Sequence, residues 1–128
     1  LRPDVHFFDV VGYEVNIKSG QACATVSVRT NEGPLSATAA GHGPVNALDV
    51  ALRKCLSELY PRIRDVRLTD YKVRVLDTDK GTDAKVRVLV EWSDHEKSWS
   101  TVGVSDDVIE ASWNALVDAL RLELMRIQ

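Results

Sequence analysis

"GYEVNI" (residues 12–17) resembles "DYKVRV" (70–75), and the apolar pattern "NALDVAL" (46–52) has a counterpart in "EASWNALVDAL" (110–120). In both halves of the chain the strand-like segment comes first and the helix-like segment follows it. Similarity of this kind at a fixed spacing indicates that one structural unit occurs twice. We therefore interpret the sequence as two copies of one unit.

The first copy, about residues 7–61, has the pattern of three strands and a helix. Alternation with period two over 7–18 predicts a strand with one apolar face. The residues expected on that face are Phe7, Val11, Tyr13, Val15 and Ile17, with Asp9 as an exception. Two further strands are predicted over 22–29 and 35–40. The helix that follows is expected to bury Leu48, Leu52, Cys55, Leu56 and Leu59 and to end at Tyr60-Pro61.

The second copy, about residues 66–127, repeats this order. Strands are predicted over 67–76, 84–92 and 98–104, with a polar turn "DTDKGTD" at 77–83 and a helix from about Asp107 whose buried stripe includes Ile109, Trp113, Leu116, Leu120 and Ile127. Segregated strands and helices of this kind predict an α+β fold. We expect two βββα units with pseudo-twofold symmetry, each antiparallel sheet covered by one helix, in a single domain over residues 1–128 without a linker.

Composition narrows the class of protein. The chain has 128 residues, 45% of them hydrophobic and 27% charged, and no apolar run long enough for a membrane span. The net charge of -3, with both signs interspersed, does not favour nucleic acid. Cys23 and Cys55 fit no metal or redox spacing, so both are expected to be buried in a reducing compartment, the cytoplasm. Since the chain begins with Leu1, we expect it to be a piece of a longer protein.

No catalytic or metal-binding pattern stands out. His6, His42 and His95 lie in no metal-ligand or nucleophile motif, and "DTDKGTD" lacks the Gly and Glu positions of a calcium loop. Trp92, Trp99 and Trp113 are interpreted as core residues, although an exposed strand aromatic would also suit an interface. A sheet surface left uncovered by the helices would require a partner, so we expect a homodimer.

The two predicted helices begin differently. The second follows Ser105, Asp106 and Asp107, whose oxygens can cap the first-turn amides, whereas the first follows Gly41-His42-Gly43-Pro44. Free amides at a helix N-terminus attract an anion such as a small carboxylate, and the alternative is a cap satisfied by water. The expected walls are small and aliphatic: Ala39, Ala40, Val45 and Ala47, beside Leu35 or Val26. An apolar wall of this kind suits an aliphatic amino acid or a short acyl acid.

Three segments resemble a known family: "GHGPVNALDVALRKCL" (41–56), "DYKVRVLDTDKGTDAKVRVLVEWSD" (70–94) and "WSTVGVSDDVIEASWNALVDAL" (99–120). They look like the C-terminal regulatory domain of the α-isopropylmalate synthase and citramalate synthase family, and the last two are most similar to the citramalate branch. The resemblance extends from about Phe7 to Arg126. His42 stands where the family often has Asn.

The resemblance implies a dimerising domain of two βββα units that binds an end-product amino acid and thereby inhibits a catalytic barrel elsewhere in the chain. Leucine is the effector in the isopropylmalate branch and isoleucine in the citramalate branch, so isoleucine is preferred here. The parent reaction condenses acetyl-CoA with a 2-oxo acid at a divalent metal, whose site belongs to the barrel. We therefore expect no catalytic residue, metal or cofactor in this domain. A domain that only dimerises is the structural alternative.

By the same resemblance, the effector lies near the helix starts at the dimer interface. The residues implied are Gly41, His42, Gly43, Pro44, Val45, Asn46 and Ala47, and more weakly Ser105, Asp106, Asp107, Ile109 and Ala111. The first-helix amides are expected to hold the carboxylate of the effector. Asp106, Asp107 or a backbone carbonyl is expected to accept its ammonium group.

Overall fold

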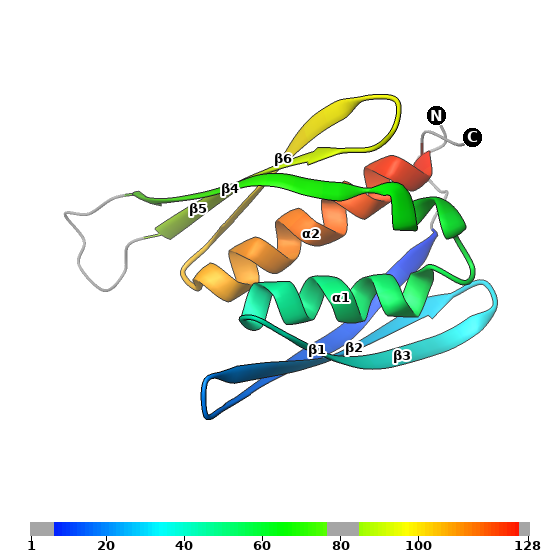
Figure 1. The fold of residues 1–128 in the computed structure, drawn as a ribbon, viewed down its shortest axis with the longest axis horizontal. Coiled ribbons are helices and arrows are strands. Elements are labelled where there is room, and N and C mark those ends of the chain that lie inside the picture. Colours follow the sequence, from blue (N-terminus) through cyan, green and yellow to red (C-terminus); the bar gives the residue numbers. More distant parts are fainter. Residues whose placement is uncertain (1–6, 77–84, 126–128) are drawn as a thin grey trace. The chain divides into compact units, whose positions relative to one another are not determined.

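The computed structural model describes residues 7–76 and 85–125, which form two compact units (Figure 1). Of the described residues, the first unit contains 7–64 with Leu124 and Met125, and the second contains Asp65–Glu123. The elements are β1 (Phe8–Lys18), β2 (Gln21–Thr30), β3 (Gly33–Gly41), α1 (Pro44–Leu56), the 3-10 helix η1 (Pro61–Asp65), β4 (Arg67–Leu76), β5 (Lys85–Ser93), β6 (Ser98–Ser105) and α2 (Val108–Met125). This order confirms the predicted α+β fold of two βββα units.

Some predictions concern residues outside the described part of the chain. These are the polar turn at 77–83, the start of the fifth strand at Ala84, and the assignments of His6 and Ile127. One other boundary differs from expectation. Helix α1 ends at Leu56 rather than Tyr60, with Ser57 as its C-cap, and the chain then forms η1 from Pro61.

Each unit is an antiparallel meander, with strand order β1-β2-β3 in one sheet and β4-β5-β6 in the other. In the first unit α1 packs on β2 and β3, and the buried side of β2 carries Ala22, Ala24, Val26 and Val28. In the second unit α2 packs on β6, since the Thr101 hydroxyl donates to the Ala115 carbonyl at 2.9 Å. The opposite face of each sheet carries the residues that alternate with these buried ones.

Short turns join the strands of the first unit. Ser19 and Gly20 have φ of 50° and 80°, the left-handed pair that suits a two-residue hairpin turn. Gly33 has φ of 109° and directly follows the next turn, where the amide of Glu32 donates to Thr30 Oγ1 at 3.1 Å. The second turn ends in a glycine because its backbone conformation is strained for other residues.

A bulge changes the predicted face of β1. Val10 pairs with Val28 and Gly12 with Ser27, so Val11 is an extra residue without a partner on β2. The inward face before the bulge is therefore Phe8 and Val10, and only from Tyr13 onward does the predicted alternation apply. The inward assignments of Phe7 and Val11 were wrong: Phe8 is 2% exposed and Val11 is 62% exposed.

The second unit has a bulge at the equivalent position. Leu68 pairs with Trp92 and Asp70 with Glu91, which leaves Thr69 as the extra residue. Asp70 corresponds to Gly12 in the repeat that the sequence revealed. The two copies therefore share an irregularity as well as their order of elements.

The cysteines and the tryptophans differ in how far each is buried. Cys55 is buried on α1, and its thiol donates to the Val26 carbonyl at 3.4 Å. Cys23 lies on the outer face of β2 and is exposed, so the prediction that both cysteines are buried was wrong for Cys23. Period two explains the error, because Ala22 and Ala24 occupy the inner face. Trp92 and Trp113 are buried, and Trp99 is half-buried.

Candidate effector site

Helix α1 begins without a side-chain cap. Its N-cap residue, Gly43, has extended backbone with φ of -168° and ψ of 177°, and Pro44 occupies the first helical position. The first intrahelical hydrogen bond runs from the Ala47 amide to the Gly43 carbonyl at 2.9 Å. Proline has no amide hydrogen there, so the helix presents its free N–H groups at Val45 and Asn46.

The side chain of Asn46 does not cap those amides. Its Oδ1 accepts a hydrogen bond at 3.0 Å from the amide of His42, which precedes the N-cap. This bond fixes the entry of the chain into the helix. Within residues 7–76 and 85–125, the amides of Val45 and Asn46 therefore have no protein acceptor.

The two glycines before the helix have different surroundings. A Cβ at Gly41 would lie 2.6 Å from both the Ala47 nitrogen and Asn46 Oδ1, so the end of β3 touches the first turn of α1. A Cβ at Gly43 would meet no described atom within 4 Å. Gly41 is thus required by packing, while Gly43 leaves space open beside the free amides.

Helix α2, in contrast, begins with side-chain caps. Asp107 Oδ1 accepts from the Ile109 amide at 2.8 Å, and Ser105 Oγ accepts from the Asp107 amide at 3.2 Å. The Ser105 hydroxyl in turn donates to the Glu110 carboxylate at 3.1 Å. The predicted caps at Ser105 and Asp107 are confirmed.

Asp106 was expected to cap the same helix, and that expectation was wrong. Its Oδ1 lies 3.1 Å from the ammonium group of Lys85 at the start of β5, and both side chains are exposed. The carboxylates of Asp106 and Asp107 thus both have protein partners, although the Lys85 pair is a weak surface one.

The predicted site residues differ in exposure. His42 and Asn46 are exposed, and Gly43, Pro44 and Val45 are half-buried. Ala47, on the inner side of α1, is completely buried. In the second unit Ala111 is likewise buried, Ile109 is half-buried and Asp106 and Asp107 are exposed. The side chains of Ala47 and Ala111 therefore belong to the core.

The expected aliphatic wall was wrong at Ala40 as well as at the fully buried Ala47. Ala39 is half-buried on the helix-facing side of β3, but Ala40 is exposed on the other side, opposite Cys23. Consecutive strand residues point to opposite faces, so the two alanines cannot line one hollow.

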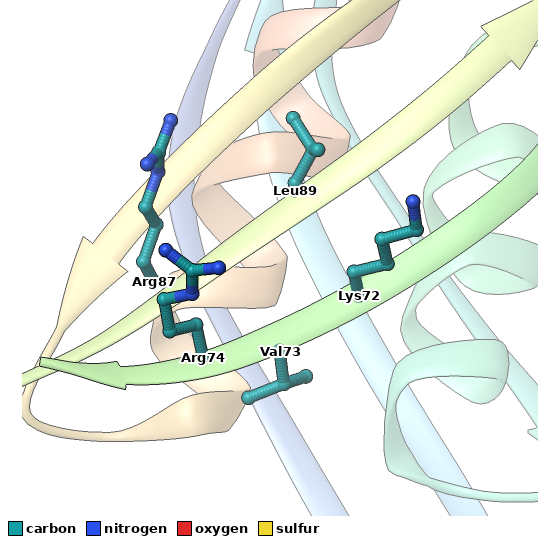
Figure 2. Close-up of a pocket in the computed structure, with 5 residues that line it drawn as sticks. All are labelled: Lys72, Val73, Arg74, Arg87 and Leu89. Carbon is teal, nitrogen blue, oxygen red and sulfur yellow. The ribbon is translucent and has the colours of Figure 1, made fainter.

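A basic hollow on the second sheet was not among the sites expected from the sequence. Lys72, Val73 and Arg74 on β4 and Arg87 and Leu89 on β5 line it (Figure 2). The only signal in the sequence is the alternation of basic and apolar residues in "DYKVRV" and "KVRVLV", which is also typical of an ordinary exposed strand face.

Two findings limit the kinds of site available. Across the parts of the chain that the structure describes, no group of three or more His, Cys, Asp or Glu side chains could hold a metal ion. No described helix is long and apolar enough to cross a membrane.

These features define a duplicated α+β domain in which one helix N-terminus is capped by side chains and the other has no side-chain cap. The chain belongs to the LeuA allosteric (dimerisation) domain family, whose model matches residues 1–123. This confirms the resemblance seen in the sequence.

The relatives favour one branch of that family. The chain is 46% identical to the (R)-citramalate synthase of Geobacter sulfurreducens, over 92% of this chain and 24% of that protein. It is 45% identical to the (R)-citramalate synthase of Aquifex aeolicus, over 94% of this chain and 24% of that protein. A 2-isopropylmalate synthase from Bacillus velezensis is 30% identical, over 92% of this chain and 22% of that protein. The chain thus spans about a quarter of the length of these relatives.

Proposed function

We propose that this chain is the feedback-regulatory and dimerisation domain of a citramalate synthase-type enzyme, and that it binds a branched-chain amino acid, isoleucine. The family match and the higher identity to citramalate synthases than to isopropylmalate synthases support the parent activity. That activity is an acyl transfer from acetyl-CoA to a 2-oxo acid, carried out by a catalytic barrel. The chain contributes regulation, and the divalent metal of the reaction belongs to the barrel.

The observation that carries the proposal is the open N-terminus of α1. Unpaired amides at Val45 and Asn46 and the positive end of the helix dipole favour a carboxylate. The space beside Gly43 admits the ligand backbone, and the half-buried side chain of Val45 offers an apolar contact. This pattern suits an aliphatic amino acid.

The ammonium group of the ligand needs an acceptor. Asp107 is occupied as the cap of α2, and its removal from that role would leave the Ile109 amide unpaired. Asp106 is held by an exposed ion pair with Lys85. We therefore favour a backbone carbonyl.

Regulation requires that the ligand bind one arrangement of the enzyme more tightly than another. A ligand with equal affinity for both arrangements shifts nothing. A site formed in part by a second copy of the domain would provide this difference, because dimer formation and ligand binding then favour each other. Free thiols at Cys23 and Cys55 are consistent with a reducing compartment, and we propose the cytoplasm.

The test is calorimetric titration of the chain with isoleucine, leucine and valine, together with sedimentation in the presence and absence of each. We expect saturable heat with isoleucine, weaker binding of the other two and a dimer that isoleucine stabilises. Tighter binding of leucine would reassign the chain to leucine sensing. A dimer that gives no heat with any of the three amino acids would contradict the sensing function and leave a structural dimerisation module.

A further inference from the structure

Arg74 on β4 lies directly opposite Arg87 on β5 in the antiparallel ladder of the second sheet. Directly opposed residues have Cβ atoms about 4.5–5.5 Å apart and share a face of the sheet. Like charges in such a pair destabilise the sheet unless another group balances them. Favourable pairing within the sheet therefore does not explain their placement.

Both arginines are on the face of the sheet that α2 does not cover. Tyr71 on β4 contacts α2 through a 2.7 Å hydrogen bond to Ser112, so Lys72 and Arg74, which are offset from Tyr71 by odd numbers of residues, point away from the helix. Figure 2 shows Arg74, Arg87, Lys72 and Leu89 on one side of the strands and Val73 on the other.

No described carboxylate balances the two guanidinium groups. Within residues 7–76 and 85–125, Arg74 and Arg87 make no hydrogen bond or ion pair. Lys72 has one partner, Asp70, at 3.5 Å, and both of those side chains are well exposed. The hollow thus combines two arginines without a described partner and a weakly paired lysine.

The first unit supplies an internal comparison. A hollow of about 450 Å³ lies on the outer face of its sheet, lined by Asn16, Lys18, Gln21, Cys23 and Ala40. Asn16 pairs with Cys23 there as Arg74 pairs with Arg87 in the second unit. The fold therefore makes this hollow twice, but only the second copy has the arginine pair, so the fold itself does not require it.

We propose that the hollow on the second sheet binds the phosphate group of a small organic phosphate between the guanidinium groups of Arg74 and Arg87. Planar guanidinium groups bind phosphate oxygens in pairs, and two of them match the charge of a phosphomonoester. The hollow is about 390 Å³, within the range of small-molecule sites and larger than a phosphate group needs.

The remaining space has an apolar side. Leu89 lies opposite Val102 of β6, and Arg87 lies opposite Val104. The apolar side chains of Leu89, Val102 and Val104 therefore share the face of the arginines. Val102 is 39% exposed and Val104 is 46% exposed. An organic body attached to the phosphate would cover part of this surface. The proposal concerns other residues than the α1 site and does not depend on the function proposed above.

The test is to titrate the 128-residue chain with phenyl phosphate and with inorganic phosphate at low ionic strength. Calorimetry measures the binding, and the NMR signals of the arginine Nε–H groups locate it. We expect both probes to shift the Arg74 and Arg87 signals, and phenyl phosphate to bind more tightly. Arg74→Gln and Arg87→Gln should each weaken binding about tenfold or more, because each removes charged hydrogen bonds.

Two other variants, each of which also removes one positive charge, serve as controls. Arg67→Gln removes an exposed arginine from the other end of β4, and Lys18→Gln removes the cation of the corresponding hollow in the first unit. Both should change phenyl phosphate affinity less than about twofold, because neither side chain lines the hollow on the second sheet. Equal loss of affinity in all four variants would show nonspecific attraction and overturn the proposal.

Two further outcomes would also overturn it. The segment between β4 and β5 carries Asp77, Asp79 and Asp83, which lie outside the described residues. If these carboxylates occupy the arginines, Arg74→Gln and Arg87→Gln will lower the stability of the chain and no probe will bind. Binding to phosphatidate vesicles that phenyl phosphate does not displace would assign the site to a lipid headgroup instead of a soluble phosphate.

Discussion

The hydroxyl of Thr101 accepts a hydrogen bond at 2.9 Å from the indole nitrogen of Trp92. The same hydroxyl donates to the Ala115 carbonyl of α2, also at 2.9 Å. Both side chains are buried, with Trp92 at 0% and Thr101 at 5% exposure. One hydroxyl therefore joins β5, β6 and α2 inside the second unit and satisfies two buried polar groups.

We expect Thr101→Val to destabilise the chain by about 1–3 kcal/mol, since it leaves the indole N–H of Trp92 buried without an acceptor. Urea unfolding followed by Trp fluorescence measures the change in the free energy of unfolding. Thr101→Ser keeps the hydroxyl and should retain most of the stability. A Ser variant as unstable as the Val variant would show that the methyl group of Thr101, rather than its hydroxyl, is what matters.

Gly103 lies against the backbone of α2. A Cβ at this position would overlap the Ala111 carbonyl, and backbone atoms of a packed helix cannot move aside cheaply. Gly103→Ala should therefore cost about 1–3 kcal/mol in unfolding free energy. Gly12→Ala is the matched control, because a Cβ at Gly12 meets nothing within 4 Å. Equal stabilities of the two variants in urea titrations would contradict the close approach.

Gly43 can be replaced in three ways that separate capping from charge. Its extended backbone accommodates any residue, and the space around it is open. We expect Gly43→Asp to act as Asp107 does on α2, stabilising the chain by about 0.5–1 kcal/mol and eliminating isoleucine binding.

The other two replacements are the controls. Gly43→Asn should cap the same amides without repelling a carboxylate. It should weaken isoleucine binding only because its side chain competes with the ligand carboxylate for the amides. Gly43→Ala neither caps nor carries charge and should retain binding. If Gly43→Ala loses isoleucine affinity as fully as Gly43→Asp, then the free amides are not the carboxylate site. Calorimetry reports the affinities and urea unfolding the stabilities.

The two thiols should react differently. Cys23 is exposed and Cys55 is buried, so a chromogenic disulfide reagent should modify one thiol of the native chain and both in urea. Burial raises the pKa of the Cys55 thiol above the ordinary value of 9.0, which further lowers its thiolate fraction. Modification of both thiols at the same rate in the native chain would contradict this arrangement.

The raised pKa of Cys55 also predicts a pH dependence. The native state favours the protonated thiol, so its contribution to stability is complete below the unfolded pKa and is lost as pH rises from about 9.0 through the folded pKa. The pKa of Tyr60 is raised too, by burial and by the charge of Glu32. Its ionisation therefore lowers the stability of the native state further as pH rises above the ordinary tyrosine pKa of 10.0. The difference in unfolding free energy between wild type and Cys55→Ala isolates the thiol and should shrink above pH 9.0. A difference independent of pH would contradict the shift.

Most of the elements were predictable from the sequence. Alternation with period two located the strands, and the apolar stripe containing Leu48, Leu52 and Cys55 located α1, because both periods are local consequences of backbone geometry. The bulge at Val11 was not predictable. Adding one residue to a strand reverses the face of every residue before it, and the two adjacent valines and the glycine in "VVGYEV" do not specify which residue is the extra one.

The contrast between the two helix starts follows from local sequence alone. Whether a first turn is capped depends on side chains within a few residues, so Gly43 and Pro44 on one side and Ser105 and Asp107 on the other decide it locally. The pairing of Arg74 with Arg87 and the close approach of Gly103 to Ala111 are visible only in the folded chain. These relationships join residues on different elements, and they depend on strand register and helix packing, which no local pattern specifies.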